Sequence, residues 1–146
     1  MWMILTNYYQ VKLTKNLSEH KNIFLWCAVI WTLIVTFFCL VSFDKLPSVK
    51  VSFSDKLGHL VFHFGITLLW FLYYKFQRNN TTQIALKNAF LFSLFYGITI
   101  EFCQDFFTST RKGDILDVFA NMCGATFAVI SLLLFTKLVN KNVQIK

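Results

Sequence analysis

The feature that most constrains this 146-residue chain is one long apolar run without a charged residue. The run extends from Ile23 to Phe43 and holds 21 residues. A helix of that length reaches across the hydrocarbon layer of a bilayer, which is about 30 Å thick. The run is too long for the core of a signal peptide, and no cleavage site of small residues follows it. We therefore predict that it crosses a membrane.

Three more apolar runs follow, so that the predicted spans are 23–43, 57–74, 84–102 and 115–136. The composition agrees, because 56% of the residues are hydrophobic and only 14% are charged, whereas soluble domains have about 25% charged residues. The sequence therefore predicts an all-α polytopic membrane protein with a bundle of four transmembrane helices. We expect a polar N-terminal segment at 1–22, the four-helix domain at 23–136 and a basic tail at 137–146.

Residues that cap helices mark the starts of two spans. Ser54 or Asp55 is expected to cap the second helix, because a side-chain oxygen there can accept from free backbone N–H groups. Asp114 is expected to cap the fourth helix, with Asp117 in its first turn. The third helix is predicted to start near residue 84 or 89.

Lysine and arginine are distributed unevenly between the two sides of the predicted bundle. The N-terminal segment, the second connection and the tail hold nine of them: Lys12, Lys15, Lys21, Lys75, Arg78, Lys87, Lys137, Lys141 and Lys146. The first and third connections hold five: Lys45, Lys50, Lys56, Arg111 and Lys112. Basic residues favour the cytoplasmic side, which predicts that both termini are cytoplasmic. Of the acidic residues, only Glu19 is then on the inner side.

This topology brings the distinctive polar residues to one depth at the outer face. The predicted polar cluster consists of His59, Glu101, Gln104, Arg111, Asp114, Asp117 and Asn121, with Asp55, His63, Asp105, Gly97 and Gly124 as secondary members. Ionisable groups at membrane depth are costly, so they normally turn inward and pair. We expect Arg111 to pair with Glu101 or Asp105, because a guanidinium can hold a carboxylate with two hydrogen bonds.

The remaining members of the cluster have expected partners as well. His59 and His63 are four residues apart and so share a helix face. They are expected to bond to Asp117, Gln104 or Asn121. Gly97 and Gly124 offer small surfaces that would let the third and fourth helices pack closely.

Three motifs in the last two-thirds of the chain resemble the VanZ-like membrane proteins. They are Asp55-Lys56-Leu57-Gly58-His59, then Tyr96-Gly97-x-x-x-Glu101-x-x-Gln104, and finally Arg111-x-x-Asp114-x-x-Asp117-x-x-x-Asn121-x-x-Gly124. His63 departs from the pattern, since many members have an aromatic residue such as Tyr there. The resemblance implies a small polytopic bacterial membrane protein. The family is named for a member linked to low-level resistance to the glycopeptide teicoplanin, and the resemblance implies no reaction, substrate or cofactor.

Three functional hypotheses follow, and we favour the first. In this hypothesis the protein is non-enzymatic and acts at the outer face of the bacterial cytoplasmic membrane, on envelope precursors or on glycopeptide susceptibility. The second is a membrane-embedded metal-dependent enzyme acting on a lipid-linked phosphate, because two histidines beside several carboxylates form a plausible ligand set. The third is a small transporter or channel subunit, although the polar residues gather at one end and do not line a full path.

Composition also sets expectations about partners. The net charge of +7 comes from residues that flank apolar runs, a pattern typical of contact with anionic lipid. The expected partners are the bilayer and lipid-linked envelope precursors, with no nucleic acid and no cofactor, and the oligomeric state is open. The four cysteines show no Cys-x-x-Cys pair, so we treat them as thiols, with Cys103 and Cys123 the pair that could approach.

Overall fold

The computed structural model describes residues 22–41, 52–108 and 113–144, and every regular element in them is helical. The elements are α2 (Ile23–Leu40), α3 (Ser52–Leu72), the π-helix η1 (Tyr73–Gln77), α4 (Thr82–Phe107) and α5 (Ile115–Gln144). Four helical segments in these ranges are long and apolar enough to cross a membrane. The prediction of an all-α protein with four transmembrane helices is confirmed, and its orientation in the membrane stays a prediction.

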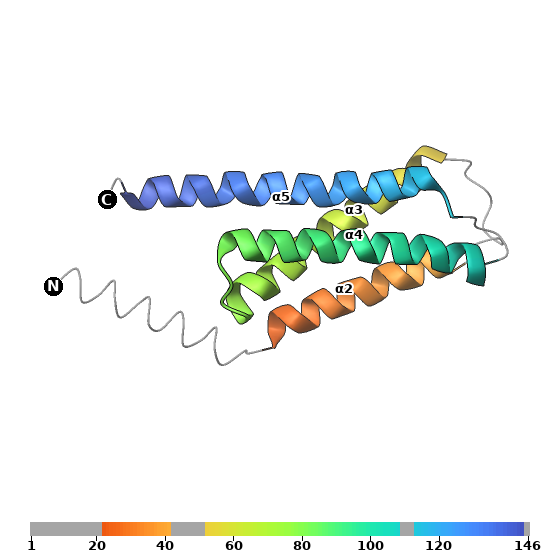
Figure 1. Cartoon of the computed structure of the whole chain (residues 1–146), viewed down its shortest axis with the longest axis horizontal. Coiled ribbons are helices and arrows are strands. Elements are labelled where there is room, and N and C mark those ends of the chain that lie inside the picture. Colours follow the sequence, from red (N-terminus) through yellow and green to blue (C-terminus); the bar gives the residue numbers. More distant parts are fainter. Residues whose placement is uncertain (1–21, 42–51, 109–112, 145–146) are drawn as a thin grey trace.

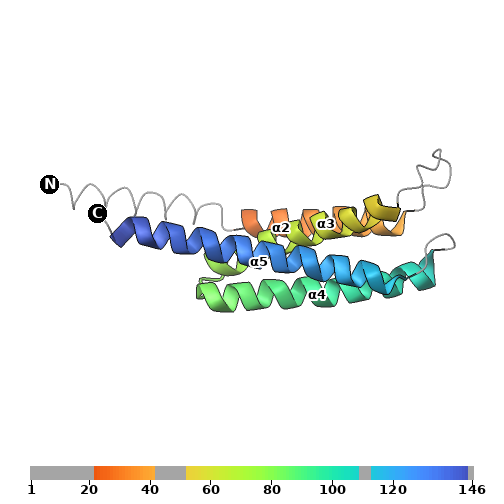
Figure 2. The same cartoon turned by 90° about the horizontal axis from the view of Figure 1, so that it is seen from above.

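The helices form a bundle in which α3 is the central element (Figures 1 and 2). It packs against α5 most extensively and also contacts α2 and α4. In Figure 1, α2 and α5 lie on opposite sides of α4, while α3 passes behind it at an angle. The polar residues of α3 therefore have neighbours on every other helix.

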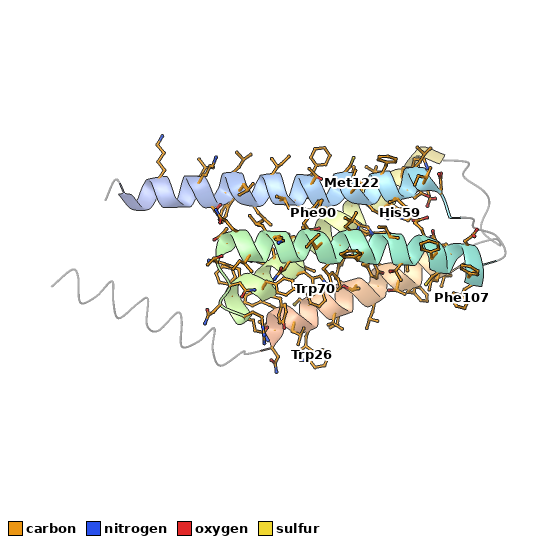
Figure 3. All side chains as sticks on the ribbon, in the orientation of Figure 1. Trp26, His59, Trp70, Phe90, Phe107 and Met122 are labelled. Carbon is orange, nitrogen blue, oxygen red and sulfur yellow. The ribbon has the colours of Figure 1, made fainter. Side chains whose placement is uncertain are left out.

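The bundle carries large apolar side chains on its outside, and its interior holds polar side chains beside apolar ones such as Ile66 and Phe71. Large hydrophobic residues such as Trp26, Phe95 and Phe102 are more than half exposed. Figure 3 shows Trp26 pointing away from the bundle, whereas His59 lies between the helices. The buried polar side chains are His59, His63, Thr67, Ser93, Glu101, Gln104, Asp117 and Asn121. This distribution suits a bilayer, because lipid solvates apolar surfaces and polar groups there must pair inside the protein.

Helix α4 shows how one sequence places small and polar side chains inside the bundle and large apolar ones outside. Its buried residues are Ala85, Leu86, Ala89, Ser93, Gly97, Ile100, Glu101 and Gln104, which recur at helical spacing. Most of them are small or polar, while Phe95, Phe102 and Phe106 of the same helix are exposed. The buried face of α4 therefore both admits close neighbours and supplies hydrogen-bonding groups.

Several helix ends differ from the predicted ones. Helix α3 begins at Ser52, so the predicted capping positions Ser54 and Asp55 fall within the helix itself. Helix α4 begins at Thr82, earlier than predicted, because the Thr81 side chain caps it by accepting from the Ile84 backbone N–H at 3.4 Å. Helix α5 continues to Gln144, so that most of the predicted basic tail extends this helix.

The turn between α3 and α4 is tight and ties α2 to the same end of the bundle. The Gln77 side-chain oxygen accepts from the Leu25 backbone N–H at 3.2 Å, and its amide donates to Asn22 at 3.1 Å. One of the first N–H groups of α2, which has no partner within its own helix, is thereby satisfied. Asn79 follows with a φ of 53°, a left-handed conformation that asparagine tolerates well.

Two glycines mark close packing, although one of them serves a different helix pair than expected. A Cβ atom at Gly124 would overlap the Leu60 carbonyl oxygen, so Gly124 lets α5 approach the α3 backbone. The expectation that Gly124 packs the third helix against the fourth is therefore wrong. A Cβ at Gly97 would lie 2.9 Å from His63 Cε1 and 3.0 Å from Asn121 Nδ2. Gly97 thus makes room on α4 for polar side chains from α3 and α5.

Candidate polar-cluster site

The ends of four helices meet at one end of the bundle, which we call the polar end. It comprises the C-terminal ends of α2 and α4 and the N-terminal ends of α3 and α5 (Figure 1). All acidic side chains in the described residues lie there, namely Asp55, Glu101, Asp105, Asp114 and Asp117. Of the described basic side chains, only Lys56 lies at this end, and the others lie toward the opposite end, namely Lys75, Arg78, Lys87, Lys137 and Lys141. The bundle therefore has a strong charge asymmetry along its length.

Lys56 joins α3 to the start of α5. Its Nζ atom lies 2.9 Å from Asp114 Oδ2 and 2.9 Å from Asp117 Oδ1. Asp117 is buried, so the lysine compensates a carboxylate that has little access to water. Asp114 also caps α5, since its Oδ1 accepts from the Leu116 backbone N–H at 2.9 Å. The ammonium of Lys56 and this backbone donor hold the pKa of Asp114 below its usual value.

His59 lies at the centre of the cluster and is almost fully buried. Its Nδ1 atom is 3.1 Å from Asn121 Oδ1 and 3.7 Å from Glu101 Oε1. Its Nε2 atom faces Asp117 Oδ2 at 4.0 Å. One imidazole on α3 is therefore surrounded by polar groups from α4 and α5.

Glu101 connects the end of α4 to the start of α5. Its Oε2 atom accepts from the Asp114 backbone N–H at 3.2 Å. Its Oε1 atom has no hydrogen-bond partner within the described part of the chain. Gly113 lets the start of α5 approach the end of α4 closely, because a Cβ at this position would lie 3.0 Å from the Glu101 carbonyl oxygen.

Gln104 and Asp105 have different surroundings although they are adjacent. Gln104 is buried and its Nε2 atom donates to the Cys39 carbonyl oxygen at 2.9 Å, which ties α4 to the end of α2. Asp105 is exposed and belongs to a groove of about 450 Å³ between α4 and α5. The lining residues of the groove are Ile98, Glu101, Phe102, Asp105, Gly113, Asp114, Ile115 and Val118. The groove therefore combines an apolar wall with three carboxylates.

The second histidine belongs to a separate polar contact deeper in the bundle. His63 Nδ1 lies 2.8 Å from Ser93 Oγ, and His63 and Ser93 are both buried. The predicted bonds from His63 to Asp117, Gln104 or Asn121 are absent from the contacts of this described side chain. Tyr96 follows on α4, and its hydroxyl lies 2.8 Å from Thr36 Oγ1 on α2. Polar contacts thus continue from the polar end toward the middle of the bundle.

The cluster stands within the part of the sequence that matches a known family. Residues 1–136 match the family described as VanZ/LLP1. The chain belongs to the VanZ/LLP1 family. It is also 30% identical over 91 residues to an uncharacterized protein of Schizosaccharomyces pombe. That match covers 62% of this chain and 54% of the yeast protein, so the chain spans about half the length of this relative. No solved structure matches the chain.

Most of the residues expected to form the site of this VanZ/LLP1 protein lie together. The structure brings His59, Glu101, Asp114, Asp117 and Asn121 into one contact network, with Gln104 beside it. Arg111, the expected partner of Glu101 or Asp105, lies outside the described residues. The four cysteines are all described and form no disulfide bond.

Two residues of this VanZ/LLP1 site were not predicted from the sequence. Lys56 precedes His59 by three residues and so shares its helix face, and this spacing was a usable signal. Ser93 lies four residues before Gly97 on the buried face of α4, which is a weaker signal.

Metal binding is the remaining chemical possibility at this site. Asp55, His59 and Asp117 each place one potential ligand atom within 4.8 Å of the other two. His63, expected beside His59 in such a set, is engaged with Ser93. The structure therefore pairs His59 with Asp55, the residue four positions before it on α3.

Proposed function

We propose that this protein is a non-catalytic component of the bacterial cytoplasmic membrane whose polar end faces outward and acts on envelope precursors or on susceptibility to teicoplanin-type glycopeptides. The observation that carries the proposal is the contact network joining Lys56, His59, Glu101, Asp114 and Asp117 across three helices. The basic residues at the opposite end support this orientation, because basic residues favour the cytoplasmic side.

The groove at the polar end supports an amphiphilic ligand. Its apolar wall, with Ile98 and Phe102 on α4 and Ile115 on α5, suits a hydrocarbon chain. Its carboxylates, from Glu101, Asp105 and Asp114, suit hydroxyl or amino groups that donate hydrogen bonds. A lipid-linked precursor carries both kinds of surface, since it joins a long apolar chain to a sugar or peptide head group.

Expression of the protein in a glycopeptide-susceptible bacterium tests this proposal. We expect the wild-type chain to change the inhibitory concentration of teicoplanin or the steady-state amount of lipid-linked precursor. Glu101→Gln keeps the shape of the side chain but removes its charge, and we expect it to lose the effect at equal protein abundance. A wild-type chain that reaches the membrane but changes neither quantity contradicts the proposal.

A metal-dependent enzyme acting on a lipid-linked phosphate is the second candidate function. The proximity of Asp55, His59 and Asp117 favours it, because a bound metal ion can polarise a phosphoryl oxygen. The test is release of inorganic phosphate from a lipid-linked diphosphate by purified protein with Zn²⁺ or Mn²⁺. Release that is lost in Asp117→Asn would support catalysis, and its absence in well-folded wild-type protein would remove this candidate.

A further inference from the structure

Asp55 and His59 share one face of α3 because they are four residues apart. Asp117 reaches the same place from the first turn of α5. The three side chains bring one ligand-type atom each within 4.8 Å of the others. His59 and Asp117 are buried, whereas Asp55 is exposed at the rim. Two carboxylates and one imidazole thus meet at the junction of two helices.

The surroundings of His59 decide which of its nitrogens carries hydrogen. Nδ1 faces two oxygen atoms that accept hydrogen bonds, Asn121 Oδ1 at 3.1 Å and Glu101 Oε1 at 3.7 Å. Nδ1 is therefore the donor, and in the neutral ring Nε2 is left with a lone pair. Nε2 faces Asp117 Oδ2 at 4.0 Å, which is too long for a hydrogen bond. Two electron-rich atoms face each other across a gap that a cation would fill.

The burial of Glu101 adds to the indication that His59 is arranged as a ligand. The residue is 6% exposed, and its Oε1 atom has no hydrogen-bond partner within the described part of the chain. This oxygen points toward the nitrogen of His59 that lies on the far side of the ring from Asp117. Histidines that bind metals typically donate their other N–H to a carboxylate or carbonyl oxygen, which fixes the ring. Glu101 and Asn121 stand in that relation to His59.

The two oxygens of Asp117 have separate roles in this arrangement. Oδ1 contacts Lys56 Nζ at 2.9 Å, and Oδ2 is the atom that faces His59. Lys56 can therefore keep its contact with Asp117 while the other oxygen binds an ion. Glu101 and Asp117 are two buried carboxylates that face the same imidazole ring, and a divalent cation would lower the cost of burying them.

We propose that Asp55, His59 and Asp117 hold one divalent transition-metal ion, with Zn²⁺ the best fit. Imidazole with carboxylates suits zinc, whereas Mg²⁺ and Ca²⁺ prefer oxygen ligands alone. Zinc binds nitrogen and oxygen at about 2.0–2.2 Å, so the ligand atoms must close in by on the order of 1 Å. Three protein ligands leave a fourth position for water or for an oxygen atom of a bound ligand. The site does not depend on the non-catalytic role proposed above, and it is the metal site that the second candidate function would require. Metal binding is measured on the protein alone, so its outcome can be separated from any test of activity.

Metal content of the full-length protein in detergent tests the site. The protein is stripped with a chelator, loaded with Zn²⁺ and passed through gel filtration before elemental analysis. We expect a single zinc ion per chain in the wild type. Asp55→Asn is the main variant, because Asp55 is exposed and the substitution keeps the size and shape of its side chain. We expect it to weaken zinc binding by at least about 10-fold, because losing even an outer-shell partner of a metal ligand lowers affinity by about that factor.

Asp105→Asn is the matched control, since it removes another exposed aspartate at the polar end that lies outside the proposed ligand set. We expect it to bind zinc like the wild type. Circular dichroism shows whether each variant keeps its helices. Folded wild-type protein that takes up no zinc would overturn the proposal. Equal losses in Asp55→Asn and Asp105→Asn would do the same, because they would indicate diffuse binding to acidic groups.

Asn121 is a positioning residue in this scheme, because it acts on the metal only through His59 Nδ1. Asn121→Leu removes the acceptor oxygen, and we expect zinc affinity to fall about 10–100-fold. Asn121→Asp keeps an acceptor oxygen in the same place and is expected to restore the affinity. Competition with a chelating dye measures both. An Asn121→Asp protein that stays as weak as Asn121→Leu would contradict the assignment of the His59 nitrogens.

Discussion

Asp117 shows how single residues hold the polar end together. It is buried, yet each of its oxygens faces a different partner, Lys56 on one side and His59 on the other. A buried carboxylate is tolerated only where such partners offset its lost hydration. Asp114 adds a more exposed contact to the same lysine and also caps α5. Lys56 is therefore the cation that both aspartates share.

The stability of the protein is expected to fall at acid pH partly through Asp114. Its pKa is lowered in the folded protein, first by the hydrogen bond from Lys56 and then by the Leu116 N–H. A lowered folded pKa gives stability that is present above the unfolded value, near 4, and is lost as the pH falls through the folded value. Thermal unfolding in detergent between pH 7 and pH 3 measures this loss.

Asp114→Asn is the control for this pH dependence. It cannot titrate, so its unfolding temperature should fall less than that of the wild type as the pH is lowered. If the unfolding temperatures of the two proteins fell in parallel as the pH is lowered, the titration of Asp114 would not contribute to stability.

The sequence predicted which residues share a depth and a helix face, but not every partner. His59, Asp117 and Asn121 could be grouped because hydropathy fixes the spans and helical spacing fixes the faces. The partner of His63 depends on how far each helix is rotated about its axis, and hydropathy does not set that rotation. His63 therefore contacts Ser93 on α4 instead of the predicted partners.

At the scale of helices, backbone contact between α3 and α5 decides the packing. Gly124 faces the Leu60 carbonyl group closely enough that a side chain would collide with it. The existence of the four spans was predictable because each is a long apolar run. The sequence did not predict which helices pack closest, since small residues indicate that a neighbouring helix is near but not which helix it is.

Gly124→Ala is expected to destabilise the protein by about 1–3 kcal/mol, because the added methyl group forces α3 and α5 apart. Gly58→Ala is the matched control on the other helix, since a Cβ at Gly58 has no neighbour closer than 4.0 Å. Alanine is the better helix former, so Gly58→Ala should leave the stability unchanged or raise it. Equal unfolding temperatures for Gly124→Ala and the wild type would refute the close contact.

The described bundle separates charge along its length while presenting apolar side chains to its surroundings. In the described residues the acidic side chains lie toward one end, and the basic side chains other than Lys56 lie toward the other. The buried residues include the hydrogen-bonding network. Such a bundle is expected to have a fixed orientation in a membrane, with the basic end in the cytoplasm.

Cysteine labelling at the two ends of α4 measures this orientation. Gln83 and Asp105 are both exposed, near the start and the end of that helix. With the four native cysteines replaced, Asp105→Cys should react with an impermeant maleimide on intact cells. Gln83→Cys should react only after the membrane is opened. The opposite pattern would reverse the orientation and place the polar end in the cytoplasm.

A double-mutant cycle between α3 and α5 tests whether polar residues from separate helices meet in one network at the polar end. Lys56→Met and Asp117→Asn are measured singly and together by unfolding in detergent, with Lys56→Met and Asp105→Asn as a control pair. We predict that the variant with both Lys56→Met and Asp117→Asn loses less free energy of unfolding than the two single variants lose in sum. The reason is that Asp117→Asn removes the charge that Lys56→Met leaves unpaired. The control pair should be additive. Additive costs for Lys56 and Asp117 would contradict the network.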